Sequence, residues 1–327
     1  GTEVPDRANV LLDALTQADV SVTDAIEHDA SALHSVHDPE LVEHLATIWS
    51  QWAPYERDYG RTRVVPYVFP TPGLLGELPM RSPAATHGRA GRFCYDTMTL
   101  VGPGSWEAIK GAADAALTAA ELVAAGTQNA YALCRPPGHH TTKSAYGGSC
   151  YLNNAALAAQ ALRESGAGRV AVIDIDAHHG NGTQAIFYDR QDVSYGSLHV
   201  DPGAGWFPHY AGYADERGTG MGVGANRNIP LAPGTGDDAW LAAVRSLCEE
   251  ARGADAVVVS LGVDAAVDDP ESPLQVSADG YRRAGELIGA LGPVVAVQEG
   301  GYDLPSLGGL VVAALTGLLA GANGRAR

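Results

Sequence analysis

Short runs of β-branched and apolar residues recur along the chain, and longer segments with helical periodicity separate them. These runs predict strands at 130–134, 170–173, 193–199, 256–260 and 294–298. The segments between them predict helices at about 105–125, at 238–252 and at 278–289, and an Ala-rich helix that ends at Glu164. Strands that alternate with helices indicate a parallel sheet covered on both faces. We therefore expect an α/β fold, a three-layer α/β/α domain with a mainly parallel sheet.

The whole chain of 327 residues is expected to form one domain. This length alone would allow two domains, but no linker, charge block or repeat divides the sequence. Near the start, apolar residues after Pro5-Asp6-Arg7 predict a first helix. Near the end, Leu307–Ala322 is uncharged and Gly-rich. Because a membrane span needs about 20 apolar residues, we expect this run to be a buried helix.

The first residues show no signal-peptide pattern, so we expect a soluble, cytoplasmic protein. The chain begins with Gly rather than Met, which suggests a shortened start. Periodicity is lost between about 52 and 92, where prolines and glycines are frequent. An irregular stretch of this length is usually functional or disordered. Its aromatic residues favour an ordered loop insertion: Tyr55, Tyr59, Tyr67 and Phe69.

The charge balance of the chain indicates which kinds of partner it would repel or attract. With 21 basic and 38 acidic residues the formal net charge is −17, which would repel nucleic acid and anionic membranes. A cationic small substrate or a basic peptide would be attracted, although the charge could equally serve only solubility. The four cysteines show no paired spacing, so no disulfide framework is expected. Cys134 and Cys150 are predicted to be buried thiols.

Polar residues follow the strand at 170–173, which is otherwise fully apolar. Asp174, Asp176, His178 and His179 come before a Gly-Asn-Gly turn. Ligand sites in open α/β sheets lie outside the carboxyl ends of the strands, and alternate residues of an extended segment share a face. Aspartate oxygen and histidine nitrogen are zinc ligands. We therefore interpret this stretch as a metal site rather than as an acidic strand end with solvated histidines.

Three further motifs also come directly after predicted strands. They are Arg135-Pro136-Pro137-Gly138-His139-His140, Leu261-Gly262-Val263-Asp264 and Glu299-Gly300-Gly301-Tyr302. Each motif alone is only suggestive. In this order, together with Asp-x-Asp-x-His-His-Gly, they resemble the histone deacetylase and acetylpolyamine amidohydrolase superfamily. The resemblance extends from the first helix to the end of the chain and implies an arginase/deacetylase-like fold.

The resemblance implies one catalytic zinc ion held by Asp176, His178 and Asp264, and three protein ligands leave a coordination position open. It implies that His139 and His140 act as general base and acid. Tyr302 matches the residue that donates a hydrogen bond to the developing oxyanion. The remaining catalytic positions are Asp174, which partners the first histidine, and Asn181, which stands where class I enzymes have the aspartate that pairs with the second.

The resemblance also implies a structural potassium ion. Its oxygen ligands would come from Asp174, Ser197 and Leu198, with main-chain oxygens of Asp176 and His178. A second potassium site near Phe187, Arg190 and Val193 is a weaker expectation. The irregular insertion at 52–92 corresponds to a loop that shapes the rim and contributes to a dimer interface, so a homodimer is also implied.

Three departures from class I enzymes point to class II deacetylases and bacterial acetylpolyamine amidohydrolases. No Trp precedes the tandem histidines, Asn181 replaces an aspartate, and Glu299 replaces a glycine. For the substrate tunnel, the resemblance assigns one wall to Phe207 and places Ser149 at the opposite wall, where an aromatic ring is usual. Gly148 is a further expected substrate-binding residue. Glu271 matches a gatekeeper glutamate that attracts a second amine, and it could equally be a solvated turn residue.

The expected function is zinc-dependent removal of an acetyl group from N-acetylated amines such as acetylpolyamines, with release of acetate. A class II-like protein acetyl-lysine deacetylase is the main alternative. An arginase-like ureohydrolase shares the fold but needs a second metal ion. A non-catalytic acetyl-amine sensor would keep the pocket without needing Tyr302 or both histidines.

Overall fold

A parallel sheet of six strands forms the centre of the computed structural model, which describes residues 2–59 and 62–325 except for the side chains of 53–59. The strand order is β1-β6-β5-β2-β3-β4, and every neighbouring pair is parallel. The strands are β1 (Asn129–Ala132), β2 (Val170–Asp174), β3 (Val193–Val200), β4 (Asn226–Leu231), β5 (Ala256–Leu261) and β6 (Val294–Gln298). The predicted α/β fold with a parallel sheet is confirmed.

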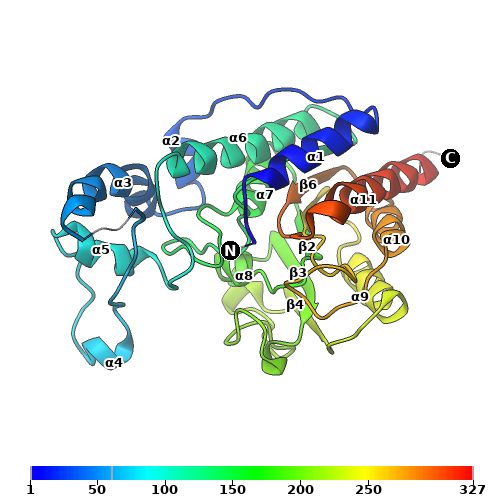
Figure 1. Ribbon diagram of the computed structural model, residues 1–327. Helices are drawn as coiled ribbons and strands as arrows, with labels where there is room; N and C mark the ends of the chain where they lie inside the picture. Colours follow the sequence, from blue (N-terminus) through cyan, green and yellow to red (C-terminus); the bar gives the residue numbers. More distant parts are fainter. Residues whose placement is uncertain (1, 60–61, 326–327) are drawn as a thin grey trace.

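Helices cover both faces of the sheet because both faces are apolar. In β2, Val170 and Val172 face the hydrophobic cluster formed with α6 (Ser105–Ala124) and α7 (Asn154–Glu164). Ala171 and Ile173 face the opposite cluster, which α9, α10 and α11 complete. These three helices span Asp237–Glu250, Ala278–Gly289 and Leu304–Arg325. The layers are visible in Figure 1, where α6 and α7 lie on one side of the strands and α9 to α11 on the other.

The sequence pattern missed one strand. β4 lies at the edge of the sheet, where it pairs only with β3. Its sequence, Asn-Arg-Asn-Ile-Pro-Leu, is largely polar, and Pro230 is tolerated because an edge strand need not donate every ladder hydrogen bond. A partly buried, largely polar strand of this kind lacks the apolar run that reveals the central strands.

The C-terminal helix α11 is longer than the predicted 307–322 segment. By length and composition it could cross a membrane, with a mean hydropathy of 1.8, and 44% of its most apolar window is buried inside the protein. It packs closely on α10: a Cβ on Gly285 would lie 2.2 Å from the carbonyl oxygen of Ala314. On another side, a Cβ on Gly308 would lie 2.5 Å from the Cβ of Ala14 in α1 (Asp6–Gln17). Gly285 of α10 and Gly308 of α11 therefore allow close helix packing.

The insertion at 52–92 is less irregular than predicted. After α2 (Ala30–His34), helix α3 (Pro39–Tyr59) continues into it, and α4 (Pro72–Leu75) and α5 (Thr86–Phe93) lie within it. In Figure 1, α4 lies at the tip of an arm that projects away from the sheet. A Cβ on Gly91 would lie only 1.7 Å from the carbonyl oxygen of Val68. This glycine therefore lets helix α5 pack closely against the segment around Val68, and it does not mark a loop.

Candidate active site

The carboxyl ends of β2 and β5 bring three predicted metal ligands together. Asp176 and His178 follow β2, and Asp264 follows the neighbouring strand β5. The Nδ1 atom of His178 lies 2.9 Å from Oδ2 of Asp264 and 3.3 Å from Oδ1 of Asp176. β2 ends at Asp174, so the side chains converge through bends beyond the strand rather than through extended alternation.

Charge and packing make this cluster suitable for a divalent cation. One donor atom from each of the three residues lies within 4.8 Å of the others. Burial and the neighbouring Asp176 carboxylate raise the pKa of Asp264 to about 7, so two carboxylates in contact form an electrostatically unfavourable pair without a cation. The glycines of the nearby motifs admit the carboxylates: a Cβ on Gly262 would lie 2.0 Å from Oδ2 of Asp176, and one on Gly300 would lie 2.4 Å from Oδ2 of Asp264.

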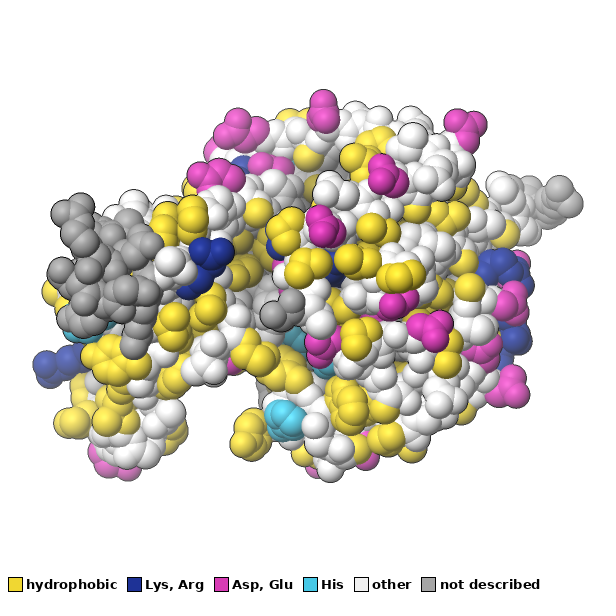
Figure 2. Space-filling view, in the orientation of Figure 1, with side chains coloured by type: hydrophobic (Ala, Val, Ile, Leu, Met, Phe, Trp, Pro, Cys, Tyr) yellow, Lys and Arg dark blue, Asp and Glu magenta, His cyan; other side chains and the backbone are white. Residues whose placement is uncertain are grey.

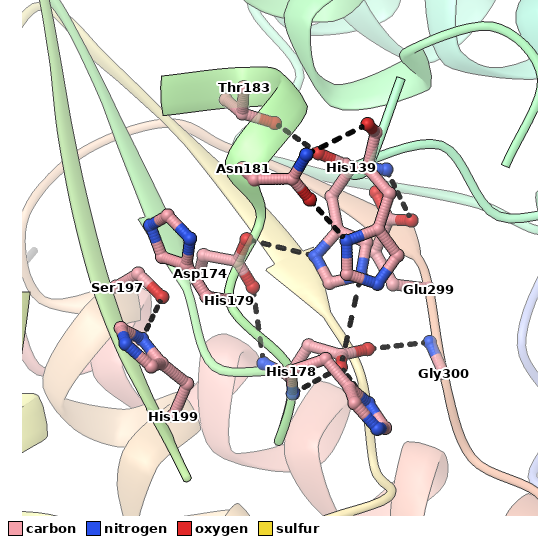
Figure 3. A network of polar contacts seen from close by, with 12 residues as sticks. His139, Asp174, His178, His179, Asn181, Thr183, Ser197, His199, Glu299 and Gly300 are labelled. Atoms are coloured by element: carbon pink, nitrogen blue, oxygen red, sulfur yellow. Dashed lines mark hydrogen bonds and ion pairs between the residues drawn. The ribbon is translucent and has the colours of Figure 1, made fainter. Parts of the chain in front are cut away.

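The tandem histidines lie beside this cluster, and each has its own polar partner (Figure 3). His139 Nδ1 lies 3.1 Å from Oδ2 of Asp174. His140 Nδ1 lies 2.8 Å from Oδ1 of Asn181, the first residue of α8 (Asn181–Phe187). The two rings are 4.0 Å apart. The structure therefore brings together all four residues that were predicted to form these two pairs.

The two histidines differ in their electrostatic environment. Burial lowers the pKa of His139, but the carboxylates of Asp176 and Asp174 outweigh this effect and raise the pKa to about 10. Burial and the positive charge of His139 lower the pKa of His140 well below its usual value. A divalent cation beside Asp176 would counteract the rise at His139. Without such a cation, these shifts leave His140 neutral and His139 protonated.

Glu299 has a structural role that its sequence position did not reveal. Its Oε2 atom accepts hydrogen bonds from the backbone N–H groups of Gly138 (2.6 Å) and His139 (3.1 Å). Its Oε1 atom is buried and has no hydrogen-bond partner among the described residues. Burial raises the pKa of this carboxyl group to about 7. Glu299 thus holds the turn that presents the tandem histidines.

The main chain next to Tyr302 is held by Arg7, a residue that the sequence motifs did not include. Arg7 donates from Nε to the carbonyl oxygen of Gly301 (2.7 Å) and from a terminal nitrogen to that of Glu299 (2.5 Å). Burial raises the pKa of Tyr302 well above its usual value, so its hydroxyl stays protonated. The only sequence signal for Arg7 was its spacing from Leu11 and Leu15, which places a charge on the buried face of α1.

Two of the expected tunnel residues lie directly against His140. The Phe207 ring is edge-on to the His140 ring at 4.7 Å. A Cβ on Gly148 would lie 2.4 Å from the His140 ring and 2.9 Å from the Phe207 ring. Ser149 follows with a φ of 62°, and its N–H donates to Oγ1 of Thr99. No side chain larger than that of glycine fits between His140 and Phe207 without displacing them.

Two polar contacts place Glu271 near the other rim residues. The carbonyl oxygen of Glu271 accepts a hydrogen bond from Nε1 of Trp206, which precedes Phe207 (2.8 Å). Its Oε1 atom accepts one from the hydroxyl of Thr2 (2.6 Å). Glu271 is half-buried, so its carboxylate is anchored and not freely solvated.

One further aromatic residue near the histidines was missed. The hydroxyl of Tyr95 donates to the carbonyl oxygen of His140 (2.9 Å), and its ring packs against Gly147, where a Cβ would lie 2.3 Å away. Tyr95 lies in the segment after α5, outside every recognised motif. No pattern in the sequence pointed to it.

The residues predicted to hold potassium are neighbours in the sheet. Asp174 and Ser197 are paired in register between β2 and β3, and Leu198 follows in β3. Asp174 Oδ2 accepts a hydrogen bond from the hydroxyl of Tyr195 (3.0 Å). Ser197 Oγ lies 2.8 Å from Nδ1 of His199, as Figure 3 shows.

These features define a histone deacetylase-type hydrolase, and comparison with known proteins agrees. Residues 1–318 match the histone deacetylase domain, so the chain belongs to the histone deacetylase family. It is 42% identical over 310 residues to acetylpolyamine amidohydrolase 1 of Pseudomonas aeruginosa, covering 94% of this chain and 88% of that protein. It is 40% identical over 322 residues to the acetylpolyamine amidohydrolase of Mycoplana ramosa, covering 97% and 92%.

Solved structures show the same relationship. The crystal structure of an acetylpolyamine aminohydrolase from Burkholderia pseudomallei superposes with a TM-score of 0.92 at 41% identity, covering 98% of this chain and 92% of that one. The HD domain of HDA15 gives a TM-score of 0.78 at 29% identity, covering 98% of this chain and 83% of that one. The predicted family and its acetylpolyamine branch are confirmed.

Proposed function

We propose that the protein is a zinc-dependent amidohydrolase that removes the acetyl group from N-acetylated amines such as acetylpolyamines and releases acetate. The observation that carries this proposal is the buried cluster of Asp176, His178 and Asp264 beside the tandem histidines. The names of its relatives, which cover almost the whole chain, support the substrate class.

Asp176, His178 and Asp264 would hold the zinc ion through two carboxylate oxygens and one imidazole nitrogen. When bound, zinc supplies a Lewis acid that polarises the acetyl carbonyl and activates water. The electrostatics of the cluster support a dication at this place, because two buried carboxylates lie in contact with one imidazole.

The chain's own residues supply the proton transfers. In the proposed reaction, the neutral ring of His140 accepts the proton of the attacking water through Nε2, because its Nδ1 faces the acceptor oxygen of Asn181. His139 is oriented by Asp174, and its ring lies next to that of His140. The hydroxyl of Tyr302 donates to the oxyanion as the water oxygen adds to the carbonyl. The C–N bond then breaks, and the proton from His140 passes to the leaving amine.

The rim supports a cationic substrate. The main chain of Glu271 is bound by Trp206, its carboxylate is held by the Thr2 hydroxyl, and the chain carries a net charge of −17. Phe207 and Gly148 would contact the acyl chain, with Ser149 beside them. A protein acetyl-lysine substrate is the alternative within the same chemistry, since the plant histone deacetylase 8 of Arabidopsis thaliana is also 40% identical, over 68% of this chain.

Further features of the proposed enzyme concern its ions, assembly and location. We propose potassium at Asp174, Ser197 and Leu198, where neighbouring strands supply oxygen atoms.

A homodimer through the arm, the part of the insertion around α4, is supported by its exposed apolar side chains (Figure 2). They are Tyr67, Leu74, Leu78 and Met80. A cytoplasmic location is supported by four cysteines that are all buried and unpaired.

The two other functions receive less support. A ureohydrolase needs a second metal ion, and the other group of candidate ligands among the described residues is His139, Cys150 and Glu299. That group contains a buried thiol, which suits manganese poorly. A non-catalytic sensor does not require the arrangement of His139, His140 and Tyr302, all of which are present.

The proposal is tested by measuring acetate release from acetylputrescine, acetylspermidine and acetyl-lysine peptides, with the metal content of the same protein determined by elemental analysis. We expect one zinc per chain and turnover of the acetylpolyamines above that of the peptides. Faster turnover of the peptides would favour the protein-deacetylase alternative. Two manganese ions per chain with urea formation from a guanidinium substrate would favour the ureohydrolase.

A further inference from the structure

One buried carboxylate links the rim of the site to the loop that carries the oxyanion donor. Oδ2 of Asp269 accepts hydrogen bonds from the backbone N–H groups of Tyr302 (2.6 Å) and Asp303 (3.2 Å). Oδ1 of the same carboxylate accepts one from the backbone N–H of Glu271 (3.0 Å). Asp269 is thus the common partner of two loops that follow different strands, β5 and β6.

The environment of Asp269 shows that these contacts are its main polar interactions. The residue is only 6% exposed, and among the described residues it forms no salt bridge with Arg, Lys or His. A buried carboxylate must be hydrogen-bonded to be tolerated. Hydrogen bonds from backbone N–H groups to an ionised carboxylate are shorter and stronger than those between neutral groups. The carboxylate therefore fixes the main chain on both loops.

The loop of Tyr302 is consequently held from two sides. Arg7 binds its carbonyl oxygens at Gly301 and Glu299, and Asp269 binds its N–H groups at Tyr302 and Asp303. Neither side chain forms a hydrogen bond with the hydroxyl of Tyr302. Asp269 also differs from Arg7 because its Oδ1 atom accepts a hydrogen bond from the backbone N–H of Glu271, the expected rim residue.

We propose that Asp269 is a positioning residue that sets the Tyr302 hydroxyl for oxyanion stabilisation and the Glu271 carboxylate for amine recognition. The inference rests on the proposed function and adds a coupling between turnover and substrate preference. A displacement of about 1 Å in a catalytic group can cost on the order of 100-fold in rate. Loss of the Asp269 carboxylate should therefore lower kcat, although the residue acts only through the loop of Tyr302 and does not contact the substrate itself.

The test compares Asp269→Asn with Asp268→Asn. Both remove one acidic charge from the same turn, but Asp268 is exposed and accepts none of these hydrogen bonds. An asparagine at 269 keeps the size of the side chain and replaces one acceptor oxygen with a donor, which cannot accept from an N–H group. We expect Asp269→Asn to lower kcat for acetylspermidine about 10- to 100-fold, with zinc content unchanged, and to reduce the preference for acetylspermidine over an acetyl-lysine peptide. Asp268→Asn should change kcat less than about 2-fold.

A double-mutant cycle separates positioning from general destabilisation. If Asp269 acts through Tyr302, Asp269→Asn should change kcat less than about 3-fold when Tyr302 is already Phe. Equal losses in the two backgrounds, or no loss in either, would overturn the proposal. Should the asparagine variant not fold, Asp269→Ser, whose hydroxyl can accept one N–H, replaces it in the same cycle.

A measurement that does not depend on activity distinguishes this inference from the proposed function. Amide hydrogen exchange of the peptide covering 300–304 should accelerate at least about 10-fold in Asp269→Asn and remain unchanged in Asp268→Asn. An unchanged exchange rate in both variants counts against the positioning role. Absence of turnover in the unmodified protein with every acetylated amine would contradict the proposed function but would leave the exchange result decisive for Asp269.

Discussion

The guanidinium of Arg7 lies 4.9 Å from the ring centroid of Tyr302, although the two residues come from opposite ends of the chain. A cation over an aromatic face is attracted by the ring, and the same guanidinium also holds two carbonyl oxygens of the Tyr302 loop. The first helix therefore contributes directly to the geometry of the candidate active site.

Arg7→Lys should lower kcat more than it changes KM. A lysine keeps the positive charge but cannot donate from two fixed directions to Gly301 and Glu299. Loss of one buried hydrogen bond costs about 1–1.5 kcal/mol, or roughly 10-fold in rate if it is expressed only in the transition state. Steady-state kinetics on acetylspermidine measures the effect. Arg135→Lys, which alters another partner of Glu3 at a more exposed site, serves as the control.

Tyr302→Phe should lower kcat by about 10²–10³-fold, because it removes one oxyanion donor and leaves the ring in place. The metal content and the melting temperature should stay close to those of the unmodified protein. Turnover within a few-fold of the unmodified protein would show that the hydroxyl does not stabilise the oxyanion.

Asp264→Ala should abolish zinc retention, because it leaves only Asp176 and His178 to bind the ion. Elemental analysis after dialysis measures this directly and needs no activity assay. Asp268→Ala removes a nearby exposed carboxylate and should retain one zinc per chain. Full zinc content in Asp264→Ala would exclude Asp264 as a ligand.

Glu271→Leu should lower kcat/KM for acetylspermidine and affect a neutral acetyl-lysine peptide much less, since the peptide brings no second ammonium group to the rim. The loss should be on the order of 1 kcal/mol, as for other partly exposed charge pairs, and should shrink as salt rises. Thr2→Val removes the hydroxyl that binds Glu271 but keeps the carboxylate, so the preference should persist. Equal responses of both substrates would identify Glu271 as a turn residue only.

Acid should destabilise the protein through His37. This buried ring contacts the carbonyl oxygen of Thr142 through Nδ1 and accepts from the N–H of Asn153 through Nε2, and burial lowers its pKa to about 4. The unfolded chain takes up the proton near pH 6.5, so stability is full above that value and falls as the pH drops towards 4. The loss at pH 5 is about 2 kcal/mol for this group.

Thermal unfolding between pH 7 and pH 4.5 checks this expectation. His37→Gln can make both hydrogen bonds without titrating, so its melting temperature should fall less steeply with acid. Part of the slope should remain, because burial also lowers the pKa of His44 and of His199. Identical slopes for the two proteins would contradict the assignment to His37.

The amino-acid sequence by itself determined the central strands and the polar motifs that follow them. Apolar runs such as Val170–Ile173 are recognisable because a strand buried on both faces must be apolar throughout. The carboxyl ends of parallel strands meet at one edge of the sheet, and the resemblance to the deacetylase superfamily assigned Asp176, His178 and Asp264 to one zinc ion there. The insertion at 52–92 was assigned too little helix, because Gly91 permits a helix contact that resembles a loop signal.

Only the tertiary structure decided which residues support the site from outside the motifs. Arg7 and Asp269 act on backbone carbonyl and N–H groups of a loop that is distant in sequence, and Glu299, although it lies in a motif, does the same through an unforeseen contact. Every residue other than proline carries both of these groups, so a hydrogen bond to them leaves no characteristic residue or spacing at the receiving end. The edge strand β4 was also missed, since its pairing with β3 depends on main-chain hydrogen bonds and not on an apolar pattern. The sequence therefore defined the chemistry of the site, and the folded chain decided how its groups are held.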